Sequence, residues 1–367
     1  MSLCYDRAMN VLLEHRVRKG RGAASNRGGR FETETHEPID DGWGGLDQPP
    51  APLRTTVAID ASRGVITRNR SPDLGFDRSI NPYRGCEHGC AYCYARPSHA
   101  YLGLSSGQDF ESRLFAKPDA AALLRAELAK PGYRCRMIAL GTNTDPYQPV
   151  ERQHRITRSI LEVLSECDHP VGIVTKSALV VRDIDILAAM AARKLAKVVI
   201  SVTTLDRRLA NRLEPRAASP ERRLGALRAL AEAGIPTAVM IGPVIPGLTE
   251  VEIESILAAA GQAGARECAY ILLRLPAEVK GLFEEWLGVH APGKAARVMA
   301  LVRDTRGGKT YDSRFGYRQR GTGAFAEIIA QRFATAARRH RFNRAPARLD
   351  TSSFRARARS GRQGELF

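Results

Sequence analysis

The sequence predicts an α/β fold in which six parallel strands form an incomplete (β/α)6 barrel with helices on its outer face. Short apolar segments rich in β-branched residues recur along the chain, and segments with helical spacing of apolar residues alternate with them. Strands of this kind are typical of a parallel sheet covered by helices. Polar, glycine and proline residues follow the strands, at the end where parallel α/β folds collect their chemistry.

The strand–helix alternation runs from residue 79 to residue 275. The expected strands span 79–83, 136–140, 171–175, 198–202, 237–241 and 268–275. The expected helices span 119–129, 154–166, 183–192, 220–233 and 250–263, with further helical stretches to about residue 303. One or two short lead-in strands are expected near 57–59 and 65–66, and a short helix or turn over 94–104.

The composition is that of a globular protein with a basic C-terminal part. The chain has 367 residues, of which 44% are hydrophobic, and this is enough for a substantial core. It contains no run of about 18 apolar residues, so no membrane span is expected, and it begins without the charged-then-apolar pattern of a signal peptide. Seven cysteines, three of them clustered, argue against a disulfide framework. We therefore expect a cytoplasmic protein.

The chain divides into three predicted regions. Residues 1–52 hold few apolar residues to offset the entropy cost of ordering, so a disordered N-terminal extension is expected. Residues 53–305 form the core with its lead-in segment, and residues 306–367 form a basic extension. Between Arg314 and Arg362, 13 arginines and two acidic residues give a net charge of +11. Arginine-rich segments bind phosphates, which predicts a nucleic-acid partner; the alternative is a solvated tail without a specific partner.

Three cysteines with C-x3-C-x2-C spacing lie close together, and these are Cys86, Cys90 and Cys93. Thiolates packed this closely repel one another unless a cation lies between them, and soft thiolates select zinc or an iron–sulfur cluster. Structural zinc and ordinary clusters take four protein ligands. A zinc site would need a fourth ligand, for which His88 or His99 is available. In a [4Fe–4S] cluster, three cysteines leave one iron without a protein ligand.

This loop resembles that of the radical S-adenosylmethionine (SAM) superfamily, in which the amino and carboxylate groups of SAM fill the open iron position. In that pattern Tyr92, the aromatic residue before the third cysteine, packs near SAM. The flanking segments NPYRG (81–85) and YAR (94–96) resemble the spore photoproduct lyase branch, and this resemblance extends from about Arg70 to about Leu275. It implies an enzyme that holds a [4Fe–4S] cluster, receives an electron from a separate donor and cleaves SAM reductively to a 5′-deoxyadenosyl radical.

The resemblance also assigns SAM contacts to the strand ends. At the second strand end most members carry a Gly-Gly-Glu segment that binds the SAM amino group. This chain lacks that segment and offers Asn143, Thr144 and Asp145 instead; the alternative for these residues is a turn that caps the next helix. At the third strand end Lys176 would hold the SAM carboxylate by opposite charge, and the alternative is a surface lysine.

The later strand ends supply the remaining predicted contacts. Ser201 is expected to hydrogen-bond the ribose, and Val244 and Ile245 are expected to flank the adenine. Arg274, at the sixth strand end, is suited to a carboxylate or a phosphate. Spacing alone assigns no role to four titratable residues that follow the cysteine loop, namely His99, Asp109, Glu111 and Lys117.

The basic segment favours a nucleic-acid substrate, in a repair or modification reaction. The alternatives are a radical SAM enzyme that acts on a protein or a small molecule, and a non-enzymatic nucleic-acid-binding protein with a structural metal site. Spore photoproduct lyase also uses a separate cysteine as hydrogen donor beside the second strand end. Residues 141–144 contain no cysteine here. Cys135 directly precedes that strand and so lies roughly 20 Å from the strand end at which the donor is needed. A thymine-dimer lyase that uses that cysteine is therefore not expected.

The last five residues, Gln363–Phe367, predict a further partner. The pattern Gln-x-x-Leu-Phe resembles the short peptide by which bacterial replication and repair proteins dock on the sliding clamp. Burial of Leu366 and Phe367 in a partner would contribute about 1.5–3 kcal/mol each. The alternative is that the pair folds back onto the barrel.

Overall fold

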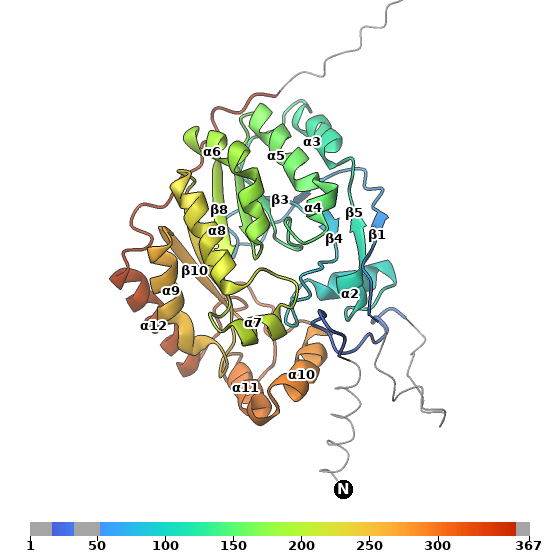
Figure 1. The fold of residues 1–367 in the computed structure, drawn as a ribbon, viewed down its shortest axis with the longest axis vertical. Coiled ribbons are helices and arrows are strands. Elements are labelled where there is room, and N and C mark those ends of the chain that lie inside the picture. The colour runs from blue at the N-terminus through green and yellow to red at the C-terminus, as the bar shows by residue number, and fades with distance from the viewer. Residues whose placement is uncertain (1–16, 33–51, 357–367) are drawn as a thin grey trace, which may run out of the picture.

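The computed structural model describes residues 17–32 and 52–356, and its centre is a seven-stranded sheet with the strand order β10-β9-β8-β7-β6-β3-β2 (Figure 1). The strands are β2 (Ile66–Arg68), β3 (Arg78–Ile80), β6 (Ile138–Leu140), β7 (Val171–Thr175), β8 (Ala196–Ser201), β9 (Thr237–Val244) and β10 (Glu267–Leu272). β2 pairs antiparallel with β3, and all other neighbours pair in parallel. Six parallel strands in chain order confirm the predicted partial barrel.

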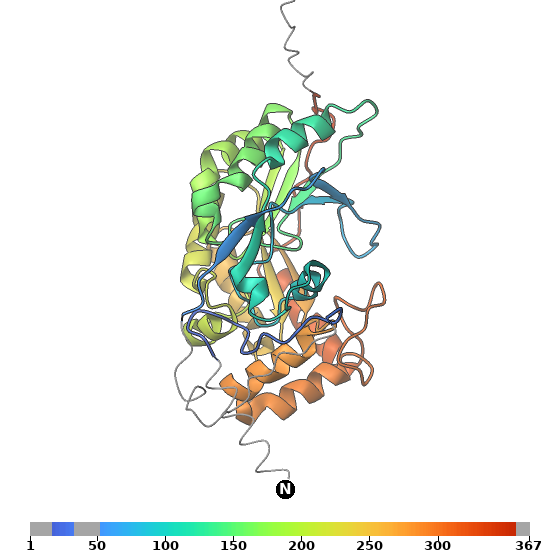
Figure 2. The ribbon, with the colours of Figure 1, turned by 90° about the vertical axis from the view of Figure 1, so that its right-hand side faces the viewer.

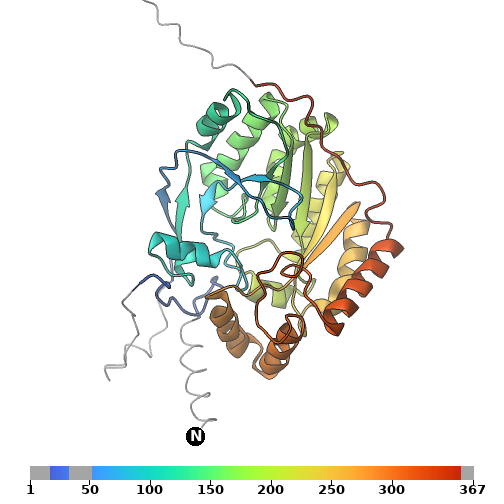
Figure 3. The ribbon, with the colours of Figure 1, turned by 180° about the vertical axis from the view of Figure 1, so that it is seen from behind.

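Helices cover one face of this sheet. They are α3 (Ala120–Leu128), α5 (Ile156–Glu166), α6 (Ile184–Ala192), α8 (Pro220–Glu232) and α9 (Ile253–Gln262), with α12 (Ala324–Arg339) packed on α9. Seen from the side, the helix layer lies on one side of the strands (Figure 2), and from behind no helix layer hides them (Figure 3). The uncovered face is the inner side of the partial barrel.

The main core lies between the sheet and these helices. Val171, Ile173 and Thr175 of β7 are buried, and the residues between them are half-buried. α5 turns an apolar stripe that includes Ile160 and Leu164 toward the strands. Each buried side chain of this size contributes about 1.5–3 kcal/mol, so packing of the strand interiors fixes the positions of the polar residues that follow them.

A second, three-stranded sheet lies beside the barrel and has the order β1-β5-β4. Its strands are β1 (Thr56–Ile59), β4 (Tyr83–Arg84) and β5 (Arg113–Ala116). The predicted strand over 79–83 is therefore divided, because β3 stays in the barrel and β4 joins the small sheet. β5 was not predicted from the sequence. Since β4 directly precedes the cysteines, the small sheet fixes where their loop begins.

The remaining helices lie outside the strand–helix alternation. They are α2 (Asp109–Ser112), α4 (Glu151–His154), α7 (Arg207–Leu213), α10 (Val279–His290) and α11 (Pro292–Asp304). α7, α10 and α11 gather at the lower end of the molecule in Figure 1, the end toward which the barrel strands run. No helix within residues 17–32 and 52–356 is long and apolar enough to cross a membrane.

The start of the predicted basic extension, residues 306–367, packs on the barrel through α12. Arg332 forms an ion pair with Glu254 of α9 at 2.6 Å, and the Phe333 ring packs against Tyr270 of β10. The structure differs from the expected extension because α12 has one apolar face, which the high arginine content of the segment obscured.

Residues 340–356 then cross the end of the barrel at which the strands start. The Asn343 side chain donates a hydrogen bond to the Cys268 carbonyl at 3.0 Å, and the Phe354 ring packs against Tyr133. The described part of the arginine-rich stretch after α12 therefore lies at the end of the barrel opposite the cysteine loop. The predicted clamp-binding residues at the C-terminus lie outside the described residues.

Residues 17–32 also pack against the core, although few of them are apolar. The amides of Gly22 and Ala23 donate to the carboxylate of Glu111 at 2.9 and 2.8 Å, and the Arg21 guanidinium donates to the Glu111 carbonyl at 2.7 Å. This segment differs from the predicted disordered extension because hydrogen bonds to a buried carboxylate, rather than apolar burial, hold it in place. Most of the rest of that extension lies outside the described residues.

Candidate active site and metal centre

The cysteine loop, residues 85–96, lies at the C-terminal ends of the barrel strands. Two backbone hydrogen bonds hold it from opposite sides. The Cys86 N–H donates to the Phe110 carbonyl at 2.9 Å, and the Ala91 N–H donates to the Leu213 carbonyl at the end of α7, also at 2.9 Å. The positions of the three cysteines thus depend on segments far from the loop in sequence.

A buried ion pair shapes the loop from within. Arg96 pairs with Glu111, and its Nε donates to the Cys90 carbonyl at 2.9 Å. Gly89 adopts a left-handed conformation with φ of 66°, and a Cβ there would lie 2.6 Å from the Glu111 carboxylate. Glu111, to which spacing assigned no role, therefore connects the loop, its arginine and the N-terminal segment. Sequence reasoning missed this because the partners are separated by up to 90 residues.

The three thiols lie close enough to influence one another. Cys86 and Cys90 are buried and Cys93 is half-buried. Burial raises the pKa of Cys86 well above its ordinary value, and the charges of Asp145, Cys90 and Cys93 raise it further. Burial, followed by the charge of Glu214, raises the pKa of Cys90 to about 12. A cation bound between the thiols would reverse this effect, because metal coordination deprotonates a thiol.

Each of the two histidines suggested as a fourth zinc ligand has one ring nitrogen in contact with another group. His88 Nδ1 lies 3.4 Å from a carboxylate oxygen of Asp145. The ring of His99 packs edge-on against Phe110, and its Nε2 is 3.0 Å from the Arg113 carbonyl. Within the described ranges no three His, Cys, Asp or Glu side chains are arranged to hold a single metal ion. Zinc ligands converge on one ion, whereas cluster thiolates bind different iron atoms, so the loop suits a [4Fe–4S] cluster.

Asp145 joins the end of β6 to the end of β7. One carboxylate oxygen accepts hydrogen bonds from the Thr175 hydroxyl at 2.7 Å and the Tyr147 amide at 2.9 Å, and the other accepts from the Lys176 amide at 2.8 Å. Burial alone would raise its pKa, but the charge of His88 and these hydrogen bonds lower it to about 2. The ionised carboxylate therefore positions the Lys176 backbone, and its direct contact with the SAM amino group stays a prediction.

Lys176 extends into the barrel toward two other predicted residues. Its Nζ donates a hydrogen bond to the Ser201 hydroxyl at 3.2 Å and lies 5.9 Å from the centroid of the Tyr92 ring. Its positive charge also lowers the pKa of Cys90, against the larger effect of burial. The structure thus brings Lys176, Ser201 and Tyr92 together beside the cysteine loop, where a zwitterionic ligand would meet both the lysine and the cluster.

Asn143 and Thr144 brace the loop that follows β6. Both amides donate to the Asn81 side chain, at 3.1 and 3.3 Å, and the Thr144 hydroxyl donates to the Tyr83 carbonyl at 3.0 Å. Thr144 is buried. Its hydroxyl is therefore used inside the protein, and the SAM-binding role predicted for these two residues remains a prediction.

Val244 and Ile245 lie at the end of β9 and are fully buried, each with an exposed fraction of 0%. The Thr249 hydroxyl accepts a hydrogen bond from the Ile245 amide at 2.9 Å and closes the turn that follows. Contact with an adenine ring would require these side chains to be uncovered. Their predicted role is therefore the one that the structure supports least directly.

The buried carboxylate of Glu214, which the sequence analysis did not single out, holds residues of the site in place. Glu214 accepts hydrogen bonds from the Tyr92 hydroxyl and from the Thr203 hydroxyl, the latter at 2.6 Å, and forms an ion pair with Arg223. Burial would raise its pKa, but the charge of Arg223 lowers it to about 2. Arg223 also donates to the Ser201 carbonyl at 3.1 Å. The pair joins the cysteine loop to the end of β8.

We expect Glu214→Ala to lower the free energy of unfolding by about 3–5 kcal/mol, because it leaves the buried Arg223 charge without its partner. Glu166→Ala is the matched control, since Glu166 pairs with Arg125 on the exposed surface and such pairs contribute at most about 1 kcal/mol. Urea unfolding followed by circular dichroism measures both. Equal losses in the two variants would contradict the account of this network.

The same pair has a defined pH dependence. The pKa of Glu214 is about 2 in the folded protein, below the ordinary value of 4.5 for a glutamate side chain. Its contribution to stability is therefore fully present above about pH 4.5 and is lost as the pH falls through about 2. Above pH 4.5, Glu214 should therefore cause no change with pH in the difference in unfolding free energy between the wild type and Glu214→Ala.

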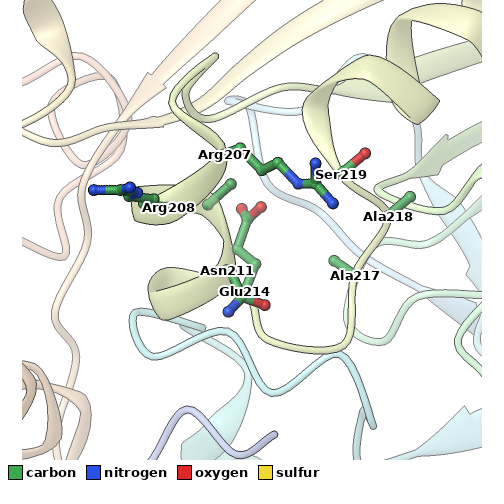
Figure 4. A pocket seen from close by; sticks show the side chains of 8 residues that line it. Arg207, Arg208, Asn211, Glu214, Ala217, Ala218 and Ser219 are labelled. Carbon is green, nitrogen blue, oxygen red and sulfur yellow. The ribbon is translucent and has the colours of Figure 1, made fainter.

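A cavity of about 490 Å³ lies on the other side of Glu214, between α7 and the segment that leads into α8 (Figure 4). Its lining includes Arg207, Arg208, Asn211 and Ser219. None of the predicted SAM contacts lines it, so it is separate from the site at the barrel mouth.

Comparison with known proteins decides the family. A sequence profile of the Radical SAM superfamily matches residues 80–260, a range that holds the cysteine loop and β6 to β9. An uncharacterized protein of Mycobacterium tuberculosis (strain ATCC 25618 / H37Rv) is 36% identical over 232 residues, which cover 63% of this chain and 68% of that protein. The chain belongs to the radical SAM superfamily. An uncharacterized protein of Methanocaldococcus jannaschii is also similar to this chain. It is 31% identical over 173 residues, which cover 47% of this chain and 62% of that protein.

Solved structures of spore photoproduct lyase are similar to this radical SAM chain. The lyase complexed with dinucleoside spore photoproduct has a TM-score of 0.50 at 16% identity, and a variant with bound AdoMet and the same photoproduct has a TM-score of 0.51 at 16% identity. Each alignment covers 77% of both chains. At this level of identity the likeness shows the fold.

Membership of the superfamily makes the chain an enzyme that uses a [4Fe–4S] cluster and SAM. The residues present fit both groups. Three mutually close thiols lie on one loop, and a lysine beside them faces the ring of Tyr92. Cys86, Cys90 and Cys93 remain the predicted cluster ligands, and Lys176 the predicted partner of the SAM carboxylate.

Proposed function

We propose that this radical SAM enzyme acts on nucleic acid, in a repair or modification reaction. The observation that carries the proposal is a group of arginines beside the cysteine loop. Arg274 follows β10, and its guanidinium carbon lies 4.6 Å from the centroid of the Tyr94 ring. Tyr94 directly follows Cys93, so this contact places Arg274 beside the cysteine loop. The Arg274 Nε is buried and has no hydrogen-bond partner in the part of the chain that the structure describes.

A second arginine lies next to Arg274. Arg306 donates to the carbonyls of Leu273 and Tyr317 at 2.7 and 2.9 Å, and its Nε also lacks a partner among the described residues. Burial, followed by the positive charge of Arg274, lowers the pKa of Arg306 to about 10. An anion bound between the two guanidiniums would relieve this repulsion. A phosphate of a nucleic-acid backbone is the anion that arginine pairs bind by paired hydrogen bonds.

The acidic residues near this group do not neutralise it. Asp73 is close enough to Arg274 for their charges to interact, but its ion pair, at 2.5 Å, is with Arg318. Asp312 forms its ion pair with Arg314 at 2.7 Å. Each of these carboxylates is therefore already matched by an arginine. Arg274, which contacts the cysteine loop at Tyr94, and the neighbouring Arg306 form no ion pair within the described residues.

The fold likeness to spore photoproduct lyase complexed with a dinucleoside photoproduct supports a nucleic-acid substrate for this chain. The same cysteine-dependent lyase reaction is not proposed. Within the described ranges the cysteines outside the loop are Cys135, Cys167 and Cys268, which precede β6, β7 and β10 or stand at their start. These positions are at the end of the strands away from the cluster loop.

When bound and reduced, the cluster and SAM supply one-electron cleavage of SAM and a radical that removes hydrogen from a substrate. The residues of the chain bind and orient the cofactor and the substrate. Lys176 and Tyr92 define the place of SAM, Asp145 and Glu214 hold those two residues, and Arg274 with Arg306 positions the substrate phosphate. The electron donor, the sliding clamp and a cytoplasmic location remain predictions from the sequence.

We expect a single-stranded oligonucleotide to stimulate formation of 5′-deoxyadenosine by the anaerobically reconstituted enzyme. Arg274→Gln should raise the oligonucleotide concentration for half-maximal stimulation roughly 10- to 100-fold, the effect of losing a hydrogen bond to a charged group. Arg266→Gln is the control, because Arg266 is an exposed arginine just before β10, at the opposite end of that strand.

The result against the proposal is equally clear. Formation of 5′-deoxyadenosine that does not respond to nucleic acid, but rises with a peptide or metabolite extract, would identify a different substrate class. An equal response of both arginine variants would remove Arg274 from the substrate site.

A further inference from the structure

The bridging loop, residues 311–321, closes the open side of the barrel. The Leu272 amide at the end of β10 donates to the Gln319 carbonyl at 2.8 Å. On the other side Arg318 forms an ion pair at 2.5 Å with Asp73, in the connection between β2 and β3. β10 and β2 are the two edge strands of the seven-stranded sheet. The loop therefore spans the gap through which a large substrate would reach the inner face.

Two aromatic rings on the bridging loop are turned to solvent. Phe315 is 54% exposed and Tyr317 is 46% exposed. An arginine lies over each ring, with the guanidinium carbon of Arg318 4.7 Å from the Phe315 centroid and that of Arg314 4.8 Å from the Tyr317 centroid. Because the rings of Phe315 and Tyr317 stay about half exposed, they contribute little to the core of this chain. Their placement beside arginines therefore points to an external partner.

The loop and its immediate approach carry a clear excess of positive charge. Residues 306–322 contain one acid, Asp312, and five basic residues, which are Arg306, Lys309, Arg314, Arg318 and Arg320. Asp312 pairs with Arg314, Asp73 pairs with Arg318, and the Arg320 guanidinium lies 5.9 Å from the Tyr270 ring centroid. The net charge of this segment is +4. An anionic partner is therefore favoured on electrostatic grounds.

The bridging loop is also joined to the arginines of the proposed substrate site. The Tyr317 carbonyl accepts a hydrogen bond from Arg306 at 2.9 Å, and Arg306 in turn lies near Arg274. The proposed phosphate site is therefore connected to the bridging loop through the hydrogen bond between Arg306 and Tyr317.

We propose that the bridging loop is a stacking platform for the unpaired bases of single-stranded nucleic acid, or of a nucleotide extruded from a duplex, at the barrel mouth. Alternating aromatic and arginine side chains suit this ligand because bases stack on rings while arginines bind phosphates and stack on bases. An acidic polypeptide would use the arginines but not the ring faces. The inference rests on the proposed function and names the form of the substrate.

The test measures binding of a fluorescent single-stranded oligonucleotide to the full-length protein by anisotropy over a range of salt concentrations. Phe315→Ala and Tyr317→Ala should each weaken binding roughly five- to 150-fold, as expected for loss of one stacked base, and leave the salt slope unchanged. Arg274→Gln, at the proposed phosphate site, should instead reduce that slope by about 0.7, because one phosphate contact is lost. Tyr317→Phe keeps the ring and should bind as the wild type does.

Ile59→Ala is the matched control, because Ile59 is a 75% exposed apolar residue on β1, away from the loop. It should bind as the wild type does. A fully paired duplex should bind more weakly than the single strand. Parallel titrations with DNA and RNA of the same sequence identify which strand the platform prefers, and preference for either supports it.

The outcomes separate this inference from the proposed function. If the wild type binds single strands but both alanine variants bind equally well, the platform is wrong and the nucleic-acid substrate stands. If the wild type binds no nucleic acid, both proposals are wrong. Both are also wrong if polyglutamate displaces the oligonucleotide from the arginines and the aromatic substitutions have no effect on binding.

Discussion

Replacement of any one of Cys86, Cys90 or Cys93 by alanine is expected to abolish the [4Fe–4S] cluster and the reductive cleavage of SAM. All three thiols lie on one loop and influence one another. Two ligands would leave a second iron of the cluster without protein coordination. Iron content, visible absorption and the electron paramagnetic resonance of the dithionite-reduced protein measure the loss.

The other cysteines provide the matched controls. Cys135→Ala, Cys167→Ala and Cys268→Ala change thiols at the strand starts and should keep a full cluster. Retention of a full cluster in Cys90→Ala, or a colourless wild type that carries zinc after anaerobic preparation, would overturn the assignment of the ligands.

Lys176→Met is expected to weaken SAM binding roughly 10- to 100-fold while the cluster remains intact. The ammonium group lies beside the Ser201 hydroxyl and over the Tyr92 ring, and within the described chain it forms no ion pair with a carboxylate. A hydrogen bond to a charged group contributes about 1.5–3 kcal/mol, and each 1.4 kcal/mol is a factor of ten in affinity. Calorimetric titration of the reconstituted protein with SAM measures the change.

Lys197→Met is the control for that prediction, because Lys197 forms an ion pair with Glu267 near the start of β8. Its SAM affinity should match that of the wild type. An unchanged affinity in Lys176→Met, with full cluster content, would show that the SAM carboxylate is bound elsewhere.

The barrel could be predicted from the sequence because its strands are short and largely apolar, with alternate residues buried, and its helices are amphipathic. The segment 171–175 was predicted as a strand with the bounds that β7 has in the structure. The cysteine spacing identified the metal centre for a similar reason, since three close thiols have few other uses. Local patterns of this kind need no knowledge of distant contacts.

The supports of the site could not be predicted, because they join residues that are far apart in sequence. Glu111 bonds to amides of the N-terminal segment, and Glu214 bonds to Tyr92, which precedes it by 122 residues. α12 was hidden by the arginines on its exposed face. The bridging loop was read as part of a tail, and only its contacts with Asp73 and β10 show that it lies at the barrel mouth.

The most direct test of a nucleic-acid substrate measures hydrogen transfer from that substrate to 5′-deoxyadenosine. The reconstituted enzyme is incubated with SAM, dithionite and an oligonucleotide deuterated in its sugars and bases, and the 5′-deoxyadenosine formed is weighed by mass spectrometry. The account predicts that deuterium appears in this product with the wild type and is lost with Cys90→Ala. Product formed at the full rate without deuterium, from an oligonucleotide that the protein binds, would contradict it.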